Sequence, residues 1–175
     1  MAKLTLILGG ARSGKSAFAV ELGRKYERVT YIATAKIMDD EMRERVKMHQ
    51  RLRPPSWKTL EVPFHADKVF SDLKGQTDLV LLDCITLYIA NILFDEKSTE
   101  KKEDYILEEV DKLCEAAKKW TADVILVSNE VGMGIVPENA LARQFRDIAG
   151  LVNQRIAQKA DSVFLISAGL PIKVK

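Results

Sequence analysis

Cysteine and histidine are scarce in this chain, which limits the chemistry that its side chains can supply. Cys84 and Cys114 are the only cysteines, they lack the short spacing of a metal site, and one possible pair is not a disulfide framework for 175 residues. We therefore expect reduced thiols. His49 and His65 are the only histidines, so imidazole chemistry has two candidate residues.

Long apolar runs and a large net charge are absent as well. No segment approaches the ~18 to 20 consecutive apolar residues of a membrane helix, and the apolar segment near the N-terminus is too short for a secretory signal. We expect a cytoplasmic protein that does not span a membrane. The 27 basic and 25 acidic residues leave a formal charge of +2, which is too small to indicate nucleic acid as a partner.

The composition that remains is typical of a globular protein. Apolar residues make up 47% of the chain and charged residues 30%, so the chain can bury a core and keep a polar surface. A length of 175 residues predicts one domain that spans residues 1–175.

Short apolar segments alternate with helical patterns along the chain. The expected strands span residues 4–8, 29–34, 57–62 (a short edge strand), 78–85, 123–128 and 162–167, and the expected helices span 16–26, 39–53, 87–94, 103–120 and 138–160. This order predicts a three-layer α/β fold, with a mostly parallel sheet covered by helices on both faces. The polar segment 95–102 is expected to be a mobile loop.

Three candidate functional segments fall where expected strands end. Gly9–Ser16 follow the first strand, Asp83 ends a central strand, and Asn129–Glu130 follow the next strand along the chain. Ligands of parallel α/β sheets bind at the carboxyl edge of the sheet. We therefore expect a ligand site at that edge.

Residues 9–16 read Gly-Gly-Ala-Arg-Ser-Gly-Lys-Ser, which is a complete phosphate-binding P-loop. Its glycines let the backbone turn tightly, so that successive N–H groups and the following helix N-terminus face a polyphosphate. Lys15 would neutralise the β and γ phosphates as a catalytic residue, and Ser16 would bind Mg²⁺. A glycine turn with a surface lysine is the structural alternative. The predicted nucleotide-binding residues of this loop are Gly9, Gly10, Ala11, Arg12, Ser13, Gly14, Lys15 and Ser16.

A P-loop also needs a carboxylate, usually at a strand end, which holds the metal ion or activates a nucleophile. Asp83 follows four apolar residues and has that position, although an aspartate there could instead cap the next helix. Glu130 is the rival carboxylate, because it ends the next strand. Ser16 and Asp83 together are the predicted metal site.

His49 has the sequence setting of a nucleophile toward phosphorus. Four cations lie near it, at positions 45, 47, 51 and 53, and they could hold a triphosphate. Two structural alternatives stay open, because His49 also continues the apolar stripe of its helix, and the charges could form a solvated face. His65 has no such setting and is interpreted as structural.

Further segments extend these features over nearly the whole chain. The most specific are Asn-Glu-Val-Gly-Met-Gly-Ile-Val-Pro at 129–137, Asp-Asp-Glu-Met at 39–42 and Arg-Val-Lys-Met-His at 45–49. Others are Tyr-Ile-Ala-Thr-Ala at 31–35, Arg-Pro at 53–54, Leu-Leu-Asp-Cys at 81–84, Phe-Arg-Asp-Ile-Ala-Gly at 145–150 and Val-Asn-Gln-Arg at 152–155. With these segments the chain resembles the bifunctional adenosylcobinamide kinases and adenosylcobinamide-phosphate guanylyltransferases of cobalamin biosynthesis.

The resemblance implies two transfer reactions on a corrinoid. With Mg²⁺, GTP or ATP phosphorylates the aminopropanol hydroxyl of adenosylcobinamide. GTP then donates GMP to that phosphate through a GMP-histidine adduct, which gives adenosylcobinamide-GDP and pyrophosphate. The resemblance also implies a P-loop core like that of recombinases and assembly as a homotrimer. The glycines of the 129–137 loop would let that loop fit a bulky corrinoid, and a plain turn is the structural alternative.

The same resemblance implies roles for single residues. His49 would be the nucleophile that carries GMP, and Glu61 and Asp83 would contact nucleotide or metal. The chain departs from the family pattern at Ala17, where arginine is expected, and at Met48, where some relatives have a second histidine. The other implied nucleotide-binding residues are Thr34, Ala35, Lys36, Gln50, Arg51, Leu52 and Arg53.

Other functions stay open at this point. A kinase alone, with His49 structural, would transfer the γ-phosphate and form no protein-bound GMP. A non-enzymatic, nucleotide-gated binding module would use the same P-loop. A recombinase-like nucleic-acid binder is disfavoured, because the sequence has a near-neutral charge and no stripe of alternating aromatic and basic residues.

Replacing Lys15 with alanine should abolish nucleotide binding, because the lysine ammonium is the cation that faces the β and γ phosphates in a P-loop. Titration of wild type and Lys15→Ala with nucleotide measures the effect. An unchanged affinity in the variant would refute the P-loop assignment.

Overall fold

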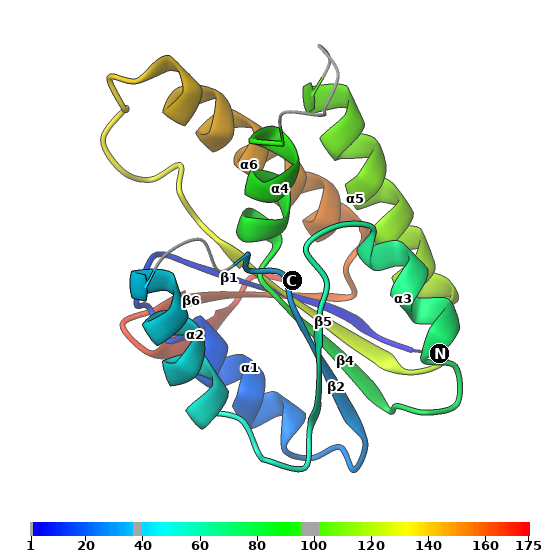
Figure 1. Ribbon diagram of the computed structural model, residues 1–175. Helices are drawn as coiled ribbons and strands as arrows, with labels where there is room; N and C mark the ends of the chain where they lie inside the picture. The colour runs from blue at the N-terminus through cyan, green and yellow to red at the C-terminus, as the bar shows by residue number, and fades with distance from the viewer. Residues whose placement is uncertain (1, 37–39, 96–101) are drawn as a thin grey trace.

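Strands and helices alternate along the chain in the computed structural model, which describes residues 2–36, 40–95 and 102–175 (Figure 1). The expected mobile loop at 95–102 falls mostly on residues 96–101, which lie outside the described residues. The elements are β1 (Leu4–Gly9), α1 (Lys15–Gly23), β2 (Val29–Ala33), α2 (Asp40–Arg51), β3 (Lys58–Glu61), α3 (Ala66–Asp72), β4 (Leu79–Asp83), α4 (Ile85–Leu93), α5 (Lys102–Lys119), β5 (Asp123–Asn129), α6 (Ala140–Lys159), β6 (Ser162–Ser167) and β7 (Leu170–Lys173).

The strands form one sheet in the order β3-β2-β4-β5-β1-β6-β7. Neighbouring strands from β3 to β6 are parallel, and β7 runs antiparallel to β6. The predicted α/β class with a mostly parallel sheet is therefore confirmed. The segment expected to be an edge strand is β3, which does lie at one edge.

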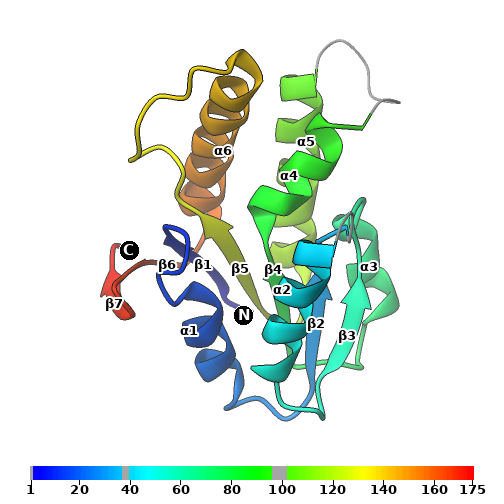
Figure 2. The same ribbon diagram turned by 60° about the vertical axis from the view of Figure 1, so that its left-hand side comes forward.

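Helices cover both faces of the sheet. Helix α1 packs on one face and α2 lies on the same side, whereas α3, α4, α5 and α6 cover the other face (Figures 1 and 2). Along β4, Val80 and Leu82 face the second layer while Leu79 and Leu81 face the first, and all four are fully buried. A strand buried on both faces needs apolar residues at every position, which explains its unbroken apolar run. Within the described ranges, none of the helices is long and apolar enough to cross a membrane.

The structure differs most from the sequence-based expectation at three elements, and other elements differ by a few residues at their ends. Helix α3 and strand β7 were not expected, and the first helix ends at Gly23 instead of reaching Tyr26. A Cβ atom at Gly23 would lie 2.5 Å from the Trp57 ring, so close packing against that ring requires glycine there. Strand β7 contains Pro171 and depends on pairing with β6, which a local sequence pattern does not reveal.

After the neighbouring strands β1 and β5, the chain turns toward opposite faces of the sheet. Strand β1 leads through residues 10–14 into α1, and β5 leads through residues 130–139 into α6. Such a switch point opens a crevice at the carboxyl edge of an α/β sheet, where ligands bind. Gly9 and Asn129 are paired in register, so the P-loop and the 129–137 segment start side by side.

Candidate active site at the carboxyl edge of the sheet

The P-loop forms where the sequence predicted it, between β1 and α1. Gly9 ends β1, and a Cβ atom there would lie 2.6 Å from the carbonyl oxygen of Ile166 in the neighbouring strand. Gly14 precedes α1 with a left-handed φ of 98°, which favours glycine. The close approach of the Ile166 carbonyl therefore requires glycine at position 9, and the left-handed backbone favours glycine at position 14. The backbone N–H of Gly169, in the turn between β6 and β7, donates to the Ser13 carbonyl and supports the loop from outside.

Lys15 is buried beneath the loop that it belongs to. Its Nζ donates a hydrogen bond to the Gly10 carbonyl at 2.6 Å. Burial lowers the pKa of the Lys15 ammonium, while the nearby Cys84 and Asp83 side chains oppose that shift. The alternative of a surface lysine beside a glycine turn is therefore wrong.

The Asp83 carboxylate joins three elements at this edge. It ends β4, and its Oδ2 accepts hydrogen bonds from the Ser16 hydroxyl and from the Tyr31 hydroxyl, both at 2.8 Å. Burial raises the pKa of Tyr31 well above its usual value, and the Asp83 charge adds to this shift. Helix α4 has Cys84 at its N-cap, with no side-chain capping bond, so the helix-cap alternative for Asp83 is wrong.

His49 lies in the last turn of α2 and faces Asp83. Its Nδ1 is 3.9 Å from Asp83 Oδ2, and 46% of its side chain is exposed to solvent. The alternative of a buried core histidine is therefore wrong. An accessible imidazole beside the carboxylate that binds the P-loop serine has the exposure that a nucleophile needs.

Of the four cations near His49 in the sequence, the three whose side chains the structure describes do not form one cluster. Lys47 Nζ pairs with Glu44 at 2.7 Å on the outer face of α2, and Arg51 is exposed. Arg53 instead lies over the Tyr31 ring, with Cζ 3.4 Å from the ring centroid. The solvated-face interpretation thus fits Lys47, whereas Arg53 has a fixed position beside the residues that contact Asp83.

The segment 34–36 follows β2 and is tied to the residue after Asp83. The Thr34 hydroxyl donates to the Cys84 carbonyl at 2.7 Å and accepts from the Cys84 N–H at 2.9 Å. Asn91 on α4 donates to the Thr34 carbonyl at 2.7 Å, and Lys36 Nζ lies 4.4 Å from the centroid of the Phe64 ring.

Burial raises the pKa of the Cys84 thiol to about 11, and both cysteines are free, as expected.

Strand β5 contributes the other side of the crevice. Asn129 donates to the Thr86 hydroxyl at 2.6 Å, and the Glu130 N–H donates to the Gly9 carbonyl at 2.9 Å. The Glu130 carboxylate accepts from the Gly132 N–H, so it folds back on its own loop. Because Asp83 contacts Ser16 directly, it is the better metal candidate of the two rival carboxylates.

Several residues that the resemblance assigns to the nucleotide site lie apart from the P-loop and Asp83. Gln50, Arg51 and Leu52 are exposed at the end of α2, and Glu61 is exposed at the end of β3. Within the described ranges, no hydrogen bond or ion pair joins these side chains to the P-loop.

Sequence reasoning did not single out three residues that support the site. Tyr31 was quoted only as the first residue of the 31–35 segment, with no role assigned to it. Asn91 lies within an apolar helix, and Gly169 lies beyond the last expected strand. Each acts through a contact with a residue distant in sequence, namely Asp83, Thr34 and Ser13. A polar side chain within an apolar run is the signal that could have found the first two.

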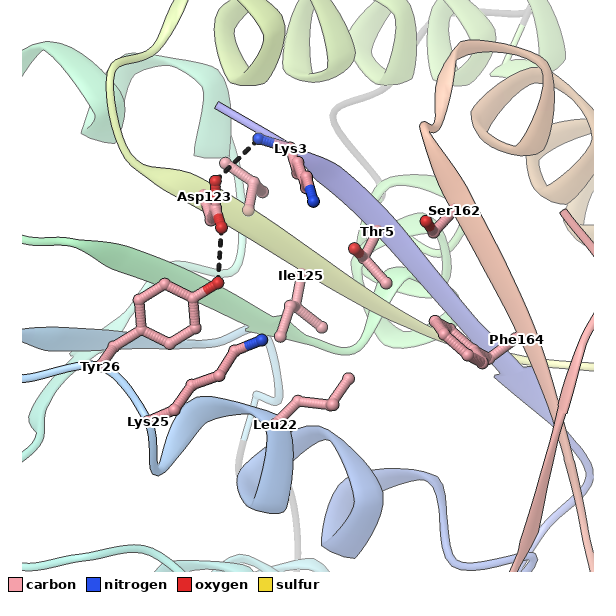
Figure 3. Close-up of a pocket in the computed structure, with 10 residues that line it drawn as sticks. Lys3, Thr5, Leu22, Lys25, Tyr26, Asp123, Ile125, Ser162 and Phe164 are labelled. Atoms are coloured by element: carbon pink, nitrogen blue, oxygen red, sulfur yellow. Dashed lines mark hydrogen bonds between the residues drawn. The ribbon is translucent and has the colours of Figure 1, made fainter. Parts of the chain in front are cut away.

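A shallow hollow of about 200 Å³ lies at the opposite edge, where the strands begin (Figure 3). Its wall includes the Asp123 carboxylate, which accepts from the Tyr26 hydroxyl and from the Lys3 N–H. Ligands of such sheets bind at the opposite, carboxyl edge, where the strands end. We therefore assign the site to the P-loop edge.

Comparison with known proteins agrees with this geometry. The family described as cobinamide kinase / cobinamide phosphate guanyltransferase matches residues 5–174. The bifunctional adenosylcobalamin biosynthesis proteins CobU of Escherichia coli and Salmonella typhimurium are 43% and 45% identical over 98% of this chain and 99% of theirs. The bifunctional protein CobP of Pseudomonas aeruginosa is 38% identical over 97% of this chain and 96% of its own. The chain belongs to this family.

Membership in the cobinamide kinase and guanyltransferase family makes the chain a transferase of cobalamin biosynthesis, with kinase and nucleotidyltransferase activity, as the sequence predicted. The alternative of a non-enzymatic binding module is therefore wrong. The kinase-only alternative is wrong for the same reason. The role of His49 as the carrier of GMP stays a prediction.

The solved structure of a protein with little sequence similarity to this chain also supports the fold. An ATPase of the type III secretion system of pathogenic bacteria superposes with a TM-score of 0.64 at 12% identity, over 99% of this chain. The superposed region spans 58% of that ATPase chain. At such low identity the likeness concerns the fold alone, and it confirms the predicted P-loop core of this family member.

Replacing Asp83 with asparagine should weaken Mg²⁺-dependent nucleotide binding by about tenfold or more, because a neutral amide holds the metal ion and Ser16 less well than a carboxylate. Asp78→Asn is the matched control, since Asp78 lies at the other end of β4 in an exposed pair with Arg28. Calorimetric titration with nucleotide, with and without Mg²⁺, measures both. Equal losses in the two variants would contradict the assignment of Asp83.

Proposed function

We propose that this chain carries out both family reactions at one site on the carboxyl edge, with His49 as the covalent carrier of GMP. One observation carries the proposal: Asp83 binds the P-loop Ser16 and also lies 3.9 Å from His49 Nδ1. A phosphate held by the P-loop would therefore be within reach of the imidazole. The nucleophile and the phosphate-binding loop share one carboxylate.

In the proposed kinase step, GTP or ATP phosphorylates adenosylcobinamide. The aminopropanol hydroxyl attacks the γ-phosphorus, the bond between that phosphorus and the β–γ bridging oxygen breaks, and the nucleoside diphosphate leaves as the hydroxyl loses its proton. Lys15 and the N-terminus of α1 would stabilise the charge that develops on the phosphate oxygens. Phosphoryl transfer needs mainly such positioning and charge stabilisation.

In the proposed guanylyl step, the imidazole attacks the α-phosphorus of GTP. A nitrogen–phosphorus bond forms, the α–β phosphate bond breaks, and pyrophosphate leaves. The phosphate of the corrinoid then attacks the same phosphorus, the nitrogen–phosphorus bond breaks, and adenosylcobinamide-GDP forms. Because Nδ1 of His49 faces Asp83, Nε2 is the nitrogen that is free to attack.

Cations around the site favour the transfer of GMP from GTP to the corrinoid phosphate, which are both negatively charged. Arg53 is held over the Tyr31 ring, and Lys36 lies over the Phe64 ring. Both are therefore positioned to offset repulsion between GTP and the corrinoid phosphate. We include Thr34–Lys36, Gln50–Arg53 and Glu61 in the proposed nucleotide site. The exposure of Gln50, Arg51 and Leu52 is compatible with contacts to a ligand that lies outside the protein surface.

The proposal includes Mg²⁺ at Ser16 and Asp83. A hydroxyl and a carboxylate that lie 2.8 Å apart at the end of a P-loop offer the oxygen ligands that Mg²⁺ prefers. When bound, the ion would neutralise phosphate charge. Tyr31 would keep the Asp83 carboxylate oriented through its hydroxyl.

The loop from 131 to 137 is the proposed contact for the corrinoid. It begins beside the P-loop, and Met133 and Ile135 are 80% and 96% exposed. Exposed apolar side chains beside a polar site suit a large, partly apolar substrate.

The proposal also places the enzyme in the cytoplasm as a single domain of residues 1–175, which the single seven-stranded sheet supports.

Incubation with α-labelled GTP and Mg²⁺ should leave an acid-labile, alkali-stable label on the wild-type protein, because a phosphoramidate has that stability. The label should be absent from His49→Ala. Asp78→Asn is the matched control, since it changes an exposed side chain at the other end of β4 and should keep the label. The measurement is protein-bound radioactivity after denaturing electrophoresis.

The γ-labelled nucleotide separates the two family activities. It should label the corrinoid product and leave the protein unlabelled. If the wild type takes no α-label, the histidine route is wrong, and GMP passes from GTP to the corrinoid phosphate without a protein-bound intermediate.

Assembly as a homotrimer is the remaining part of the proposal. Light scattering should then give a mass of three times the 19.7 kDa of one chain. A mass of one chain would contradict the trimer and any site built between subunits.

A further inference from the structure

A second cluster of ligand-type side chains lies away from the P-loop, between α3 and α5. His65 precedes α3, Asp67 lies in its first turn, and Glu109 lies in the middle of α5. One ligand atom from each residue lies within 4.8 Å of the other two, and His65 Nδ1 is 3.3 Å from Glu109 Oε2. Figure 2 shows α3 against α5 on the face of the sheet opposite α1.

The surroundings leave this cluster with unused acceptors. The Glu109 side chain is 5% exposed, and its Oε1 accepts from Lys112 Nζ at 2.9 Å, which leaves Oε2 facing His65. Asp67 Oδ1 is buried and has no hydrogen-bond partner among the described residues. A buried carboxylate oxygen without a donor is costly, and a cation would remove that cost. The half-exposed His65 ring leaves an entry path.

We propose that His65, Asp67 and Glu109 bind one divalent transition-metal ion of the zinc type, with water completing the coordination. Zinc accepts imidazole nitrogen together with carboxylate oxygen, whereas Mg²⁺ and Ca²⁺ favour sites made of oxygen alone. Ligands bound tetrahedrally at zinc distances lie about 3.4 Å apart. The His65–Glu109 distance of 3.3 Å already matches this spacing.

Charge favours the ion as well. The two carboxylates carry two negative charges and Lys112 supplies one positive charge, so with a neutral His65 the cluster keeps a negative charge. A hydrogen bond between His65 and Glu109 would satisfy Glu109 without a metal. It would not satisfy the buried oxygen of Asp67, which the ion does.

The position of the cluster gives the ion a structural role near the active site. The turn before His65 is bound by Asn91, which donates to the Pro63 carbonyl at 3.2 Å and to the Thr34 carbonyl at 2.7 Å. Lys36 lies over the ring of Phe64 in the same turn. An ion that joins His65 to α5 therefore fixes the turn that supports residues 34–36.

Metal uptake by the full chain tests the proposal. Protein purified without a histidine tag and stripped with a chelator should bind one Zn²⁺ per chain with micromolar affinity or better, and zinc should raise its melting temperature. His65→Asn should lose both effects, because the amide replaces the imidazole while asparagine tolerates the left-handed φ of 51° at this position. Asp67→Asn should weaken binding at least tenfold.

Two further variants distinguish this site from adventitious binding. His49→Asn removes the other histidine and should keep full zinc uptake. Lys112→Met should tighten zinc binding several-fold, because it removes the cation that competes for Glu109. Cobalt substitution should give a visible absorption band in the wild type and none in His65→Asn.

Failure of zinc uptake in the wild type overturns the proposal, as does uptake that survives His65→Asn or is lost in His49→Asn. Weaker binding by Lys112→Met also contradicts it. None of these outcomes depends on GMP labelling at His49, so the two proposals fail separately.

Discussion

The Asp83 carboxylate is the interaction on which the active-site geometry depends. Hydroxyl donors from Ser16 on α1 and Tyr31 on β2 meet at one of its oxygens, and the same oxygen faces His49 on α2. These contacts bring together elements that are distant in sequence. Both of its hydrogen-bond donors are hydroxyls of residues that lie far from Asp83 in the sequence.

Backbone contacts also hold the P-loop against the sheet. The Gly9 carbonyl accepts from the Glu130 N–H, and the Ser13 carbonyl accepts from the Gly169 N–H. The loop is thus fixed by the strand ends on both sides of β1. This arrangement leaves no room for a side chain at Gly9 and places the 130–139 loop directly beside the phosphate-binding loop.

The two histidines occupy comparable positions, and the two proposals assign them different roles. Each is about half exposed and each faces a largely buried carboxylate, Asp83 for His49 and Glu109 for His65. His49 lies beside the phosphate-binding loop, so its accessible nitrogen suits covalent transfer. His65 lies beside two carboxylates on the helical layer, so it suits a metal ion that stabilises the turn before α3.

The sequence by itself determined the fold class and the P-loop, because apolar strand runs and the spacing of Gly9, Gly14, Lys15 and Ser16 are local patterns. It also placed Asp83 at a strand end. It left open whether Asp83 capped a helix and whether His49 was buried, since both questions concern neighbours distant in sequence. Only the tertiary structure decided them, by bringing β2, β4, α1 and α2 together at one edge of the sheet. The cluster of His65, Asp67 and Glu109 was hidden for the same reason: 42 residues separate Asp67 from Glu109 in the sequence, and the packing of α3 on α5 closes that gap.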